Sequence, residues 1–563
     1  MATSNLSAMH RATADRLGPR TALRWKRLGL YHDLSWDDYR GRADDAAAAL
    51  IDLGVEVGDR VALFSENRFE WLVADIATLA AGSANLPLHA SLTAPQARYQ
   101  LAHGGARGLI LDDQTQADKV FSIINDLPDL EWIASFDPIV VPSSVRIPIH
   151  RWEGLVQRGR LASSQSREEV HRREKALTSD DLATIIYTSG TTGPPKGVML
   201  THGNLVSNAE AVMAISPVTH EDVVLSWLPY SHIYARTVDH YLTALGGATV
   251  TLAESIETLV MNLVETRPTW MTAVPRFYEK IWAKVEPLSS EARAATLHKI
   301  FGPRLRYLSS GGAPLPKYLA EGFLASGIPL LEGYGLTESS PVISFNRLDA
   351  NKVGTVGPPV PGVEVRIAED GEVLTRGPHV MKGYWKDPES TRRAINDGWL
   401  HTGDIGLLDE DGYLVITDRK KNLIVTSQGK NIAPAELEHL LTSDPAIDQA
   451  VIYGDRRPFV TALIVPNFPF LQAKAEELGC PIETEGDLIV SEPLRAFYAE
   501  RIAELMRAVG HPERVRAFQL LARPFSAEAD EVTATLKVRR KFILDKFANQ
   551  LDALYHASKP ARR

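Results

Sequence analysis

Hydrophobic positions near the N-terminus recur at helical spacing and then give way to short apolar runs. After Ser35, which begins a capping-box-like SWDD start, apolar residues follow at helical intervals until Gly54: Tyr39, Ala43, Ala46, Leu50 and Leu53. This spacing predicts an amphipathic helix. The apolar runs 61–64, 108–111 and 182–187 are separated by helical segments or turn residues, as strands are. The alternation of helices and strands predicts α/β architecture with largely parallel sheets.

The pattern changes near residue 405. The run LLDEDGYLVITDRKKNLIV carries an Asp-Gly turn between two apolar runs, which predicts a β-hairpin. Downstream, residues 434–441 and 494–506 have helical spacing, whereas 450–453 and 459–465 are strand-like. We therefore expect a large N-terminal domain of packed α/β sheets followed by a small α+β domain.

Composition narrows the class of function. The chain has 563 residues, 44% of them apolar, so it can bury a large core but is too long for one compact domain. Its net charge of -9 argues against a nucleic-acid-binding protein, whose binding face is normally basic. A single cysteine, Cys480, excludes a disulfide framework and a multi-cysteine metal site. A small-molecule substrate is the better expectation.

The N-terminal segment is polar, and no stretch reaches the roughly 18 apolar residues needed to span a bilayer. We expect a cytoplasmic protein without a transmembrane segment. Peripheral membrane contact and the oligomeric state stay open.

The strongest local signal is the loop YTSGTTGPPKG at 187–197. A triphosphate needs closely approaching backbone amides, hydroxyl donors and a cation. The loop offers all three: Gly190 and Gly193; Thr188, Ser189, Thr191 and Thr192; and Lys196. It is not a Walker A loop, because Gly197 and Val198 follow the lysine where that motif needs Ser or Thr. The alternative is a plain solvent loop, against which the two prolines, the lysine and the preceding strand all count.

Three further motifs follow in order: YGLTE at 334–338, GWLHTGD at 398–404 and DRKKNLI at 418–424. Together with the loop they resemble the acyl-adenylate-forming (AMP-binding) superfamily. The resemblance extends from GDRVALFSEN at 58–67 to TATLKVRRK at 533–541, which is nearly the whole chain. It implies an AMP-binding adenylation domain over 1–418, a hinge over 419–421 and a mobile C-terminal domain over 422–563.

The same resemblance assigns roles to the residues of these motifs. The segments SGGAPL and EGYGLTE line the adenine pocket with Gly311, Gly312, Ala313, Glu332, Gly333, Tyr334 and Gly335. Thr337 donates to the α-phosphate, and Glu338, with a contribution from Thr188, is a ligand for Mg²⁺. Asp404 accepts from the ribose hydroxyls, and Arg419 reaches the same nucleotide. Taken alone, Asp404 and Arg419 are equally compatible with a surface turn and a surface ion pair, and a single carboxylate in a turn, such as Glu338, is more often a solvated residue.

The resemblance also implies a catalytic cation near the C-terminus. In TATLKVRRK the preferred residue is Lys537, whereas registration on a Gly-Lys ending would select Arg539. In relatives the C-terminal domain rotates about a residue two positions after the ribose-binding arginine. The matching residue here is Lys421. Rotation at this hinge would withdraw Lys537 and bring the segment around Gly429 towards a pantetheine tunnel.

Softer signals concern the acid. FSENRFEW at 64–71, LPYSHIYAR at 228–236 and AVPRFYEKIW at 273–282 resemble the long-chain fatty acyl-CoA synthetase branch. By this resemblance His232, Tyr234 and Arg236 lie near the acyl or coenzyme A path, although Tyr230 and Ala235 depart from the branch pattern.

The expected enzyme is therefore a fatty acid-CoA ligase that uses ATP, Mg²⁺ and coenzyme A and forms an acyl adenylate first. A fatty acyl-AMP ligase serving a carrier protein is an alternative, but no inserted segment is obvious around 366–388. A non-catalytic sensor on the same scaffold is another, and the presence of Lys537, Glu338 and Asp404 argues against it.

Overall fold

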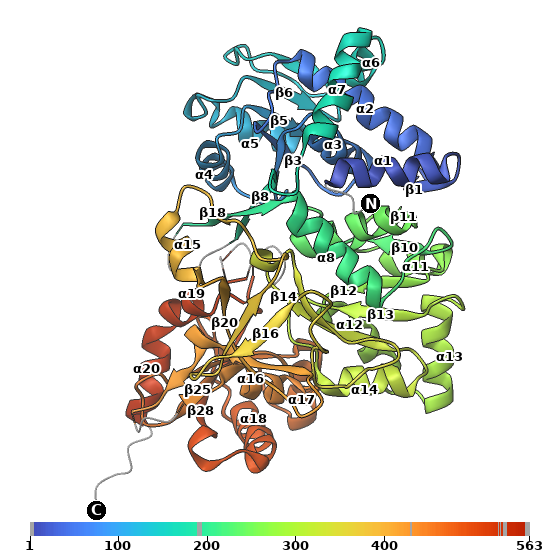
Figure 1. Ribbon diagram of the computed structural model, residues 1–563. Coiled ribbons are helices and arrows are strands. Elements are labelled where there is room, and N and C mark those ends of the chain that lie inside the picture. The colour runs from blue at the N-terminus through green and yellow to red at the C-terminus, as the bar shows by residue number, and fades with distance from the viewer. Residues whose placement is uncertain are drawn as a thin grey trace, which may run out of the picture. The chain divides into compact units, whose positions relative to one another are not determined.

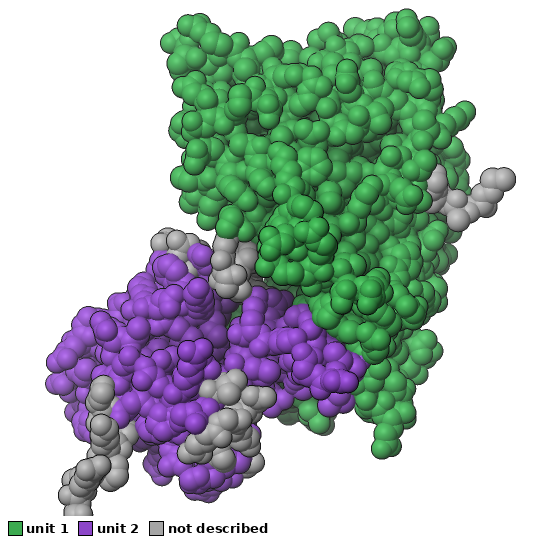
Figure 2. Space-filling model, turned by 60° about the vertical axis from the view of Figure 1, so that its left-hand side comes forward, with its two compact units in different colours: residues 1–366, 374–402, 408–414 green, residues 367–373, 403–407, 415–563 purple. Residues whose placement is uncertain are grey.

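The computed structural model describes residues 5–188, 194–427, 431–526, 529, 531–532 and 538–557. The chain forms two compact units, coloured separately in Figure 2. Unit 1 consists of residues 1–366, 374–402 and 408–414, and unit 2 of residues 367–373, 403–407 and 415–563. The expected hinge at 419–421 and the boundaries on either side of it stay predictions.

The first sheet of unit 1 has eight strands in the described residues and is parallel in its interior. Its order is β18 (Gly383–Tyr384), β9 (Lys196–Thr201), β8 (Leu182–Thr188), β4 (Ala84–Leu88), β3 (Arg60–Phe64), β5 (Gly108–Leu111), β6 (Trp132–Ser135) and β7 (Ile149–Arg151). Only the pairings of β8 with β9 and of β9 with β18 are antiparallel among them. The three apolar runs are confirmed as strands β3, β5 and β8.

The second sheet of unit 1 also has eight described strands and again a parallel interior. Its order is β15 (Val342–Phe345), β14 (Leu330–Gly335), β13 (Tyr307–Ser310), β12 (Trp270–Ala273), β10 (Val223–Ser226), β11 (Thr249–Leu252), β1 (Thr21–Arg27) and β2 (Leu30–Ser35). Antiparallel strands β15 and β2 close the two edges.

Helices connect the strands of both sheets (Figure 1). They are α1 (Leu6–Leu17), α2 (Trp36–Asp52), α3 (Phe69–Ala80), α4 (Ala94–Gly104), α5 (Gln114–Phe121), α6 (Trp152–Arg160), α7 (Ser164–Ala176), α8 (His202–Ile215), α9 (Ile233–Ala235), α10 (Thr243–Gly246), α11 (Leu259–Thr266), α12 (Pro275–Val285), α13 (Ser290–Phe301), α14 (Lys317–Ala325) and α15 (Pro388–Ala394). A π-helix, η2 (Arg236–Leu242), joins α9 to α10. The described residues contain no helix with the length and apolarity that a membrane crossing requires.

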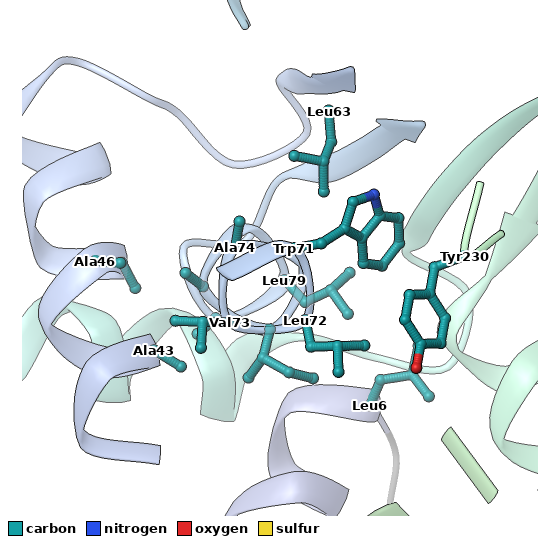
Figure 3. Packing of buried hydrophobic residues seen from close by; sticks show 14 of the residues in the cluster. Leu6, Ala43, Ala46, Leu63, Trp71, Leu72, Val73, Ala74, Leu79 and Tyr230 are labelled. Carbon is teal, nitrogen blue, oxygen red and sulfur yellow. The ribbon is translucent and has the colours of Figure 1, made fainter. Parts of the chain in front are cut away.

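Helix α2 is the amphipathic helix that the sequence predicts. The Ser35 side chain accepts a hydrogen bond from the Asp38 backbone N–H, which satisfies one of the free donors of the first turn. The small residues Ala43 and Ala46 of α2 face α3 (Figure 3). On the side of α3 that faces away from α2, Trp71 packs against Tyr230, and the two ring centroids lie 5.4 Å apart. Helix α3 is therefore buried nearly all round and lies at the centre of the core.

A smaller five-stranded sheet contributes residues to both units. Its path is β16 (Glu364–Ile367), β17 (Glu372–Arg376), β20 (Trp399–Leu408) and β19 (Ile395–Asn396), with β21 (Leu414–Arg419) beside β20. Strands β20 and β21 are the two arms of the predicted hairpin, and Gly412 occupies its turn with φ of 81°.

Unit 2 is a mixed α+β unit. Its own sheet has the order β24 (Ile447–Tyr453), β25 (Val460–Pro466), β28 (Val515–Leu521), β27 (Leu488–Ile489) and β26 (Thr484–Glu485), and a short ladder pairs β22 (Ile424–Val425) with β23 (Asn431–Ile432). Its helices are α16 (Pro434–Thr442), α17 (Phe468–Leu478), α18 (Glu492–Leu505), α19 (Arg540–Lys546) and α20 (Ala548–Ala557). The predicted fold class, a large α/β domain with a smaller α+β domain, is confirmed.

Candidate active site

The phosphate loop of the sequence spans the gap between β8 and β9. Thr188 ends β8 and lies opposite Lys196, the first residue of β9, in the antiparallel register. The Lys196 Nζ donates a hydrogen bond to Ser390 Oγ at 2.8 Å. Of the residues between them, five lie outside the described part of the chain: Ser189, Gly190, Thr191, Thr192 and Gly193.

The two expected adenine segments meet in unit 1. Strand β13 leads into Gly311 and Gly312, and Gly312 has φ of 79°, which favours glycine. The Glu332 Oε1 accepts a hydrogen bond from the Leu315 N–H at 2.9 Å, so β14 is tied directly to the preceding glycine loop. Burial raises the pKa of Glu332 to about 8. Ala313 is exposed.

Two glycines of the second segment are required by strand pairing. A Cβ at Gly335 would lie 1.7 Å from the Pro341 carbonyl oxygen, and one at Gly333 would lie 2.7 Å from Phe345 Cδ2. Both contacts come from the close approach of β15 to β14. Tyr334, between the two glycines, is half-buried. The close approach of the two strands explains these glycines without a ligand, and their adenine role stays a proposal.

Thr337 and Glu338 lie on a single 3-10 turn, η3 (Thr337–Ser339), directly after β14. The Glu338 carbonyl accepts from the Met381 N–H at 2.9 Å, and its Oε1 accepts from the Tyr384 hydroxyl at 2.9 Å. Tyr384 is therefore part of the candidate site although sequence reasoning missed it. Its only signal was an aromatic pair in the segment MKGYWKDPEST.

The donor chemistry around Glu338 fits Mg²⁺ better than a metal held by protein alone. Within the described residues there is no group of three or more His, Cys, Asp and Glu side chains that could hold a metal ion. Magnesium is usually held by one or two carboxylates together with substrate phosphates and water. A single half-buried carboxylate with one oxygen facing no described partner suits that role.

One of the expected acyl-path residues, Tyr234, lies beside the glycine loop. The Tyr234 hydroxyl is hydrogen-bonded to Ser309 Oγ at 2.9 Å. A Cβ added at Gly311 would lie 3.0 Å from Tyr234 Cζ. His232 caps the start of α9, where its Nδ1 accepts from the Tyr234 N–H. The structure thus brings Tyr234 against the segment expected to bind adenine.

Arg236, which the sequence placed near the same path, is a core residue. It is fully buried and ion-paired with Asp75, and its Nη1 and Nε donate to Thr184 Oγ1 at 2.7 Å and to the Tyr241 hydroxyl at 2.8 Å. Asp75 was not singled out from the sequence, because nothing in α3 marks its partner more than 150 residues away. This cluster fixes Arg236, which lies two residues after Tyr234, in the core.

In unit 2 the two residues expected to contact the ribose and the nucleotide, Asp404 and Arg419, form an ion pair with each other. Asp404 on β20 is 3% exposed, and its Oδ1 lies 3.1 Å from Arg419 Nε at the end of β21. Glu372 supports both strands, since it accepts from the Gly403 N–H at 2.9 Å and from Lys420 Nζ at 2.9 Å. Such a pair can present a carboxylate and a guanidinium to one nucleotide.

The expected hinge residue and catalytic cations can be placed only in part. Lys421 is exposed on the short turn η4 (Lys420–Asn422). Arg539 is exposed, and its guanidinium carbon lies 5.4 Å from the centre of the Phe542 ring. Gly429 and Lys537 lie outside the described residues.

Comparison with known proteins defines the class. The AMP-binding enzyme family matches residues 10–385, and the AMP-binding enzyme C-terminal domain matches residues 421–559. The chain belongs to the AMP-binding enzyme family.

Two curated relatives cover nearly the whole chain. The long-chain-fatty-acid–CoA ligase FadD15 of Mycobacterium tuberculosis is 34% identical over 94% of this chain and 93% of its own. The peroxisomal long chain acyl-CoA synthetase 7 of Arabidopsis thaliana is 30% identical over 94% of this chain and 82% of its own.

Solved structures share the fold. ATP-bound MatB of Rhodopseudomonas palustris is 25% identical, with a TM-score of 0.75 over 97% of this chain and 99% of its own. The adenylation domain of a carboxylate reductase from Mycobacterium chelonae is 22% identical, with a TM-score of 0.80 over 98% of this chain and 91% of its own.

Proposed function

We propose that this protein is a long-chain fatty acid-CoA ligase that works in two half-reactions. In the first, a fatty carboxylate oxygen attacks the α-phosphorus of ATP, and pyrophosphate leaves. In the second, the thiol of coenzyme A attacks the acyl carbon of the adenylate, and AMP leaves. The observation that carries this proposal is the identity of 34% over 94% of the chain to a long-chain-fatty-acid–CoA ligase.

The residues of unit 1 supply what the first half-reaction needs. Two anions must approach each other, so positive charge has to be held at the phosphates. Lys196 and Thr188 stand at the two ends of the phosphate loop, and Thr337 follows the adenine segment. Glu338, with a contribution from Thr188, would hold Mg²⁺, which when bound neutralises phosphate charge. Orientation and electrostatics, rather than an enzyme nucleophile, then account for most of the acceleration.

The residues of unit 2 complete the proposal. Asp404 and Arg419 hold the ribose, Lys421 is the pivot between domains 1–418 and 422–563, and Lys537 is the cation of the first half-reaction. The support is the formed Asp404–Arg419 pair and the match of residues 421–559 to the family's C-terminal domain. Because a long-chain fatty acid partitions into bilayers, we also propose a cytoplasmic enzyme with peripheral membrane contact.

Separate assays of the two half-reactions test these assignments. Lys537→Ala is expected to lower fatty-acid-dependent pyrophosphate release about 100-fold or more, while acyl transfer from supplied acyl adenylate to coenzyme A is retained. Arg539→Ala is the matched control and should retain both half-reactions. Equal loss of both half-reactions in Lys537→Ala, or the selective loss appearing in Arg539→Ala instead, would refute the assignment. Acyl transfer to a carrier protein but not to coenzyme A would favour an acyl-AMP ligase.

A further inference from the structure

The segment around Tyr384 makes backbone contacts with the two motifs expected to bind magnesium and the phosphates, at Lys196–Gly197 and at Glu338. Strand β18 pairs with β9, which places Tyr384 opposite Val198. On one side the Trp385 N–H donates to the Gly197 carbonyl at 2.7 Å, next to Lys196. On the other, the Met381 N–H donates to the Glu338 carbonyl at 2.9 Å. The segment around Tyr384 is therefore fixed between the lysine and the carboxylate.

The Tyr384 side chain contacts the functional group of each motif. Its hydroxyl donates to Glu338 Oε1 at 2.9 Å, and its ring centre lies 4.8 Å from Lys196 Nζ. A cation at this distance from an aromatic face is attracted to the ring. The other contact of the ammonium is with Ser390 Oγ, at 2.8 Å. One aromatic ring thus holds a cation on its face and an anion at its edge.

The direction of the hydrogen bond matters for metal binding. A phenol that donates to Oε1 orients the carboxylate. The second oxygen, Oε2, then remains available for a metal ion, since no hydrogen bond or ion pair to it is found within the described residues. An ionised carboxylate can only accept hydrogen bonds, so the phenol is the donor in this contact. The direct contact of Lys196 with Ser390 rather than with Glu338 keeps the two opposite charges apart.

We propose that Tyr384 is a positioning residue that holds the Glu338 carboxylate and the Lys196 ammonium on one rigid ring, ready for the two sides of magnesium–triphosphate. This proposal rests on the proposed function, since it names how that nucleotide site is prepared. The hydroxyl serves the metal side through Glu338, and the ring face serves the phosphate side through Lys196. The two contacts can therefore be removed one at a time.

Two variants separate these contacts, and a third is a matched control. Tyr384→Phe removes the hydroxyl and keeps the ring, whereas Tyr384→Leu removes both. Tyr413 forms a comparable unit away from the motifs, with Lys352 Nζ 5.3 Å from its ring and its hydroxyl donating to the Ala350 carbonyl at 3.2 Å. Tyr413→Phe therefore controls for the loss of a tyrosine hydroxyl beside a lysine.

The measurement is the affinity for ATP in the full-length protein, by calorimetry, with Mg²⁺ and with EDTA. The Mg²⁺-dependent gain is the ratio of the ATP affinity with Mg²⁺ to that with EDTA. Tyr384→Phe is expected to lower this ratio about 10-fold and to leave the affinity in EDTA unchanged. Tyr384→Leu should also weaken ATP binding in EDTA about 3-fold or more, because the support for Lys196 is lost. Tyr413→Phe should match the wild type in both conditions.

Other results would overturn the proposal. These are an unchanged Mg²⁺-dependent gain in Tyr384→Phe, or an equal loss with Mg²⁺ and EDTA. An equal loss in acyl transfer from supplied adenylate, which needs neither metal nor pyrophosphate, would show general damage and would also reject it. A wild type that binds magnesium–ATP but activates no fatty acid would overturn the proposed function alone, because the Tyr384 comparison uses no acid.

Discussion

Replacing Asp75 by asparagine removes the negative charge of the buried cluster that Asp75 forms with Arg236 and Tyr241. Asp75 is fully buried, ion-paired with Arg236, and accepts from the Tyr241 hydroxyl and from Asn85 Nδ2, each at 2.8 Å. Asparagine keeps the size but removes the charge with which the guanidinium is paired. Breaking a buried pair by removing one partner typically costs about 3–5 kcal/mol. We expect a loss of that order in the free energy of unfolding.

The pKa of Asp75 gives a second, smaller value for the free energy that its charge contributes to folding. Burial disfavours its charged form, but the Arg236 charge and the surrounding donors outweigh burial and lower the pKa to about 2. Relative to an ordinary aspartate this corresponds to about 2 kcal/mol of stabilisation. Because the pKa in the folded state is the lower one, the contribution is complete above pH 4 and disappears as pH falls through about 2. The deficit of Asp75→Asn should therefore be constant between pH 5 and 8.

Urea denaturation followed by circular dichroism measures this deficit. The control is Asp33→Asn, which removes the charge from the Arg24–Asp33 pair, whose nitrogen and oxygen lie 2.7 Å apart and whose side chains are 39% and 43% exposed. Exposed pairs contribute about 1 kcal/mol or less, so this variant should stay within that range. A deficit for Asp75→Asn no larger than that of Asp33→Asn would refute the role given to the buried cluster.

Three further predictions concern the site. Burial raises the pKa of Glu332 to about 8, so the folded state loses stability as pH rises from about 4.5 to 8. The free energy of unfolding of Glu332→Gln, measured by urea denaturation, should therefore rise by about 1–3 kcal/mol relative to the wild type between pH 5 and 9. A difference that stays constant with pH would contradict this. Gly335→Ala places a Cβ 1.7 Å from the Pro341 carbonyl oxygen, and we expect a loss of about 2 kcal/mol or more, checked by thermal unfolding; wild-type stability would show that β15 shifts freely. Asp404→Ala should weaken ATP binding about 10-fold to 100-fold in calorimetry, and unchanged affinity would argue against ribose binding.

Local features of the fold could be predicted from the sequence because their causes are local. The Ser35 cap, the helical spacing after it and the Asp-Gly turn of the later hairpin act within a few residues. The apolar run that became β8 needed only its flanking turn residues to be recognised. The order of strands in the two large sheets could not be predicted this way, because it depends on pairings between distant segments.

The candidate site was predicted as a set of motifs, but not as a set of contacts. Tyr384 lies 46 residues from Glu338 and Arg236 lies 161 residues from Asp75, so neither pairing leaves a periodic signal. A charged residue in LPYSHIYAR suggested a ligand path, and only the structure shows that its partner is a core aspartate. Gly333 and Gly335 show the opposite case, in which a motif glycine also has a structural cause.

The most direct test of the central claim is pyrophosphate release by the wild type with ATP and Mg²⁺ across saturated acids from acetate to stearate, with and without coenzyme A. We expect release that depends on the acid and is greatest with long chains, together with one acyl-CoA formed per AMP once coenzyme A is added. No pyrophosphate with any fatty acid, or release only with short or aromatic acids, would contradict it.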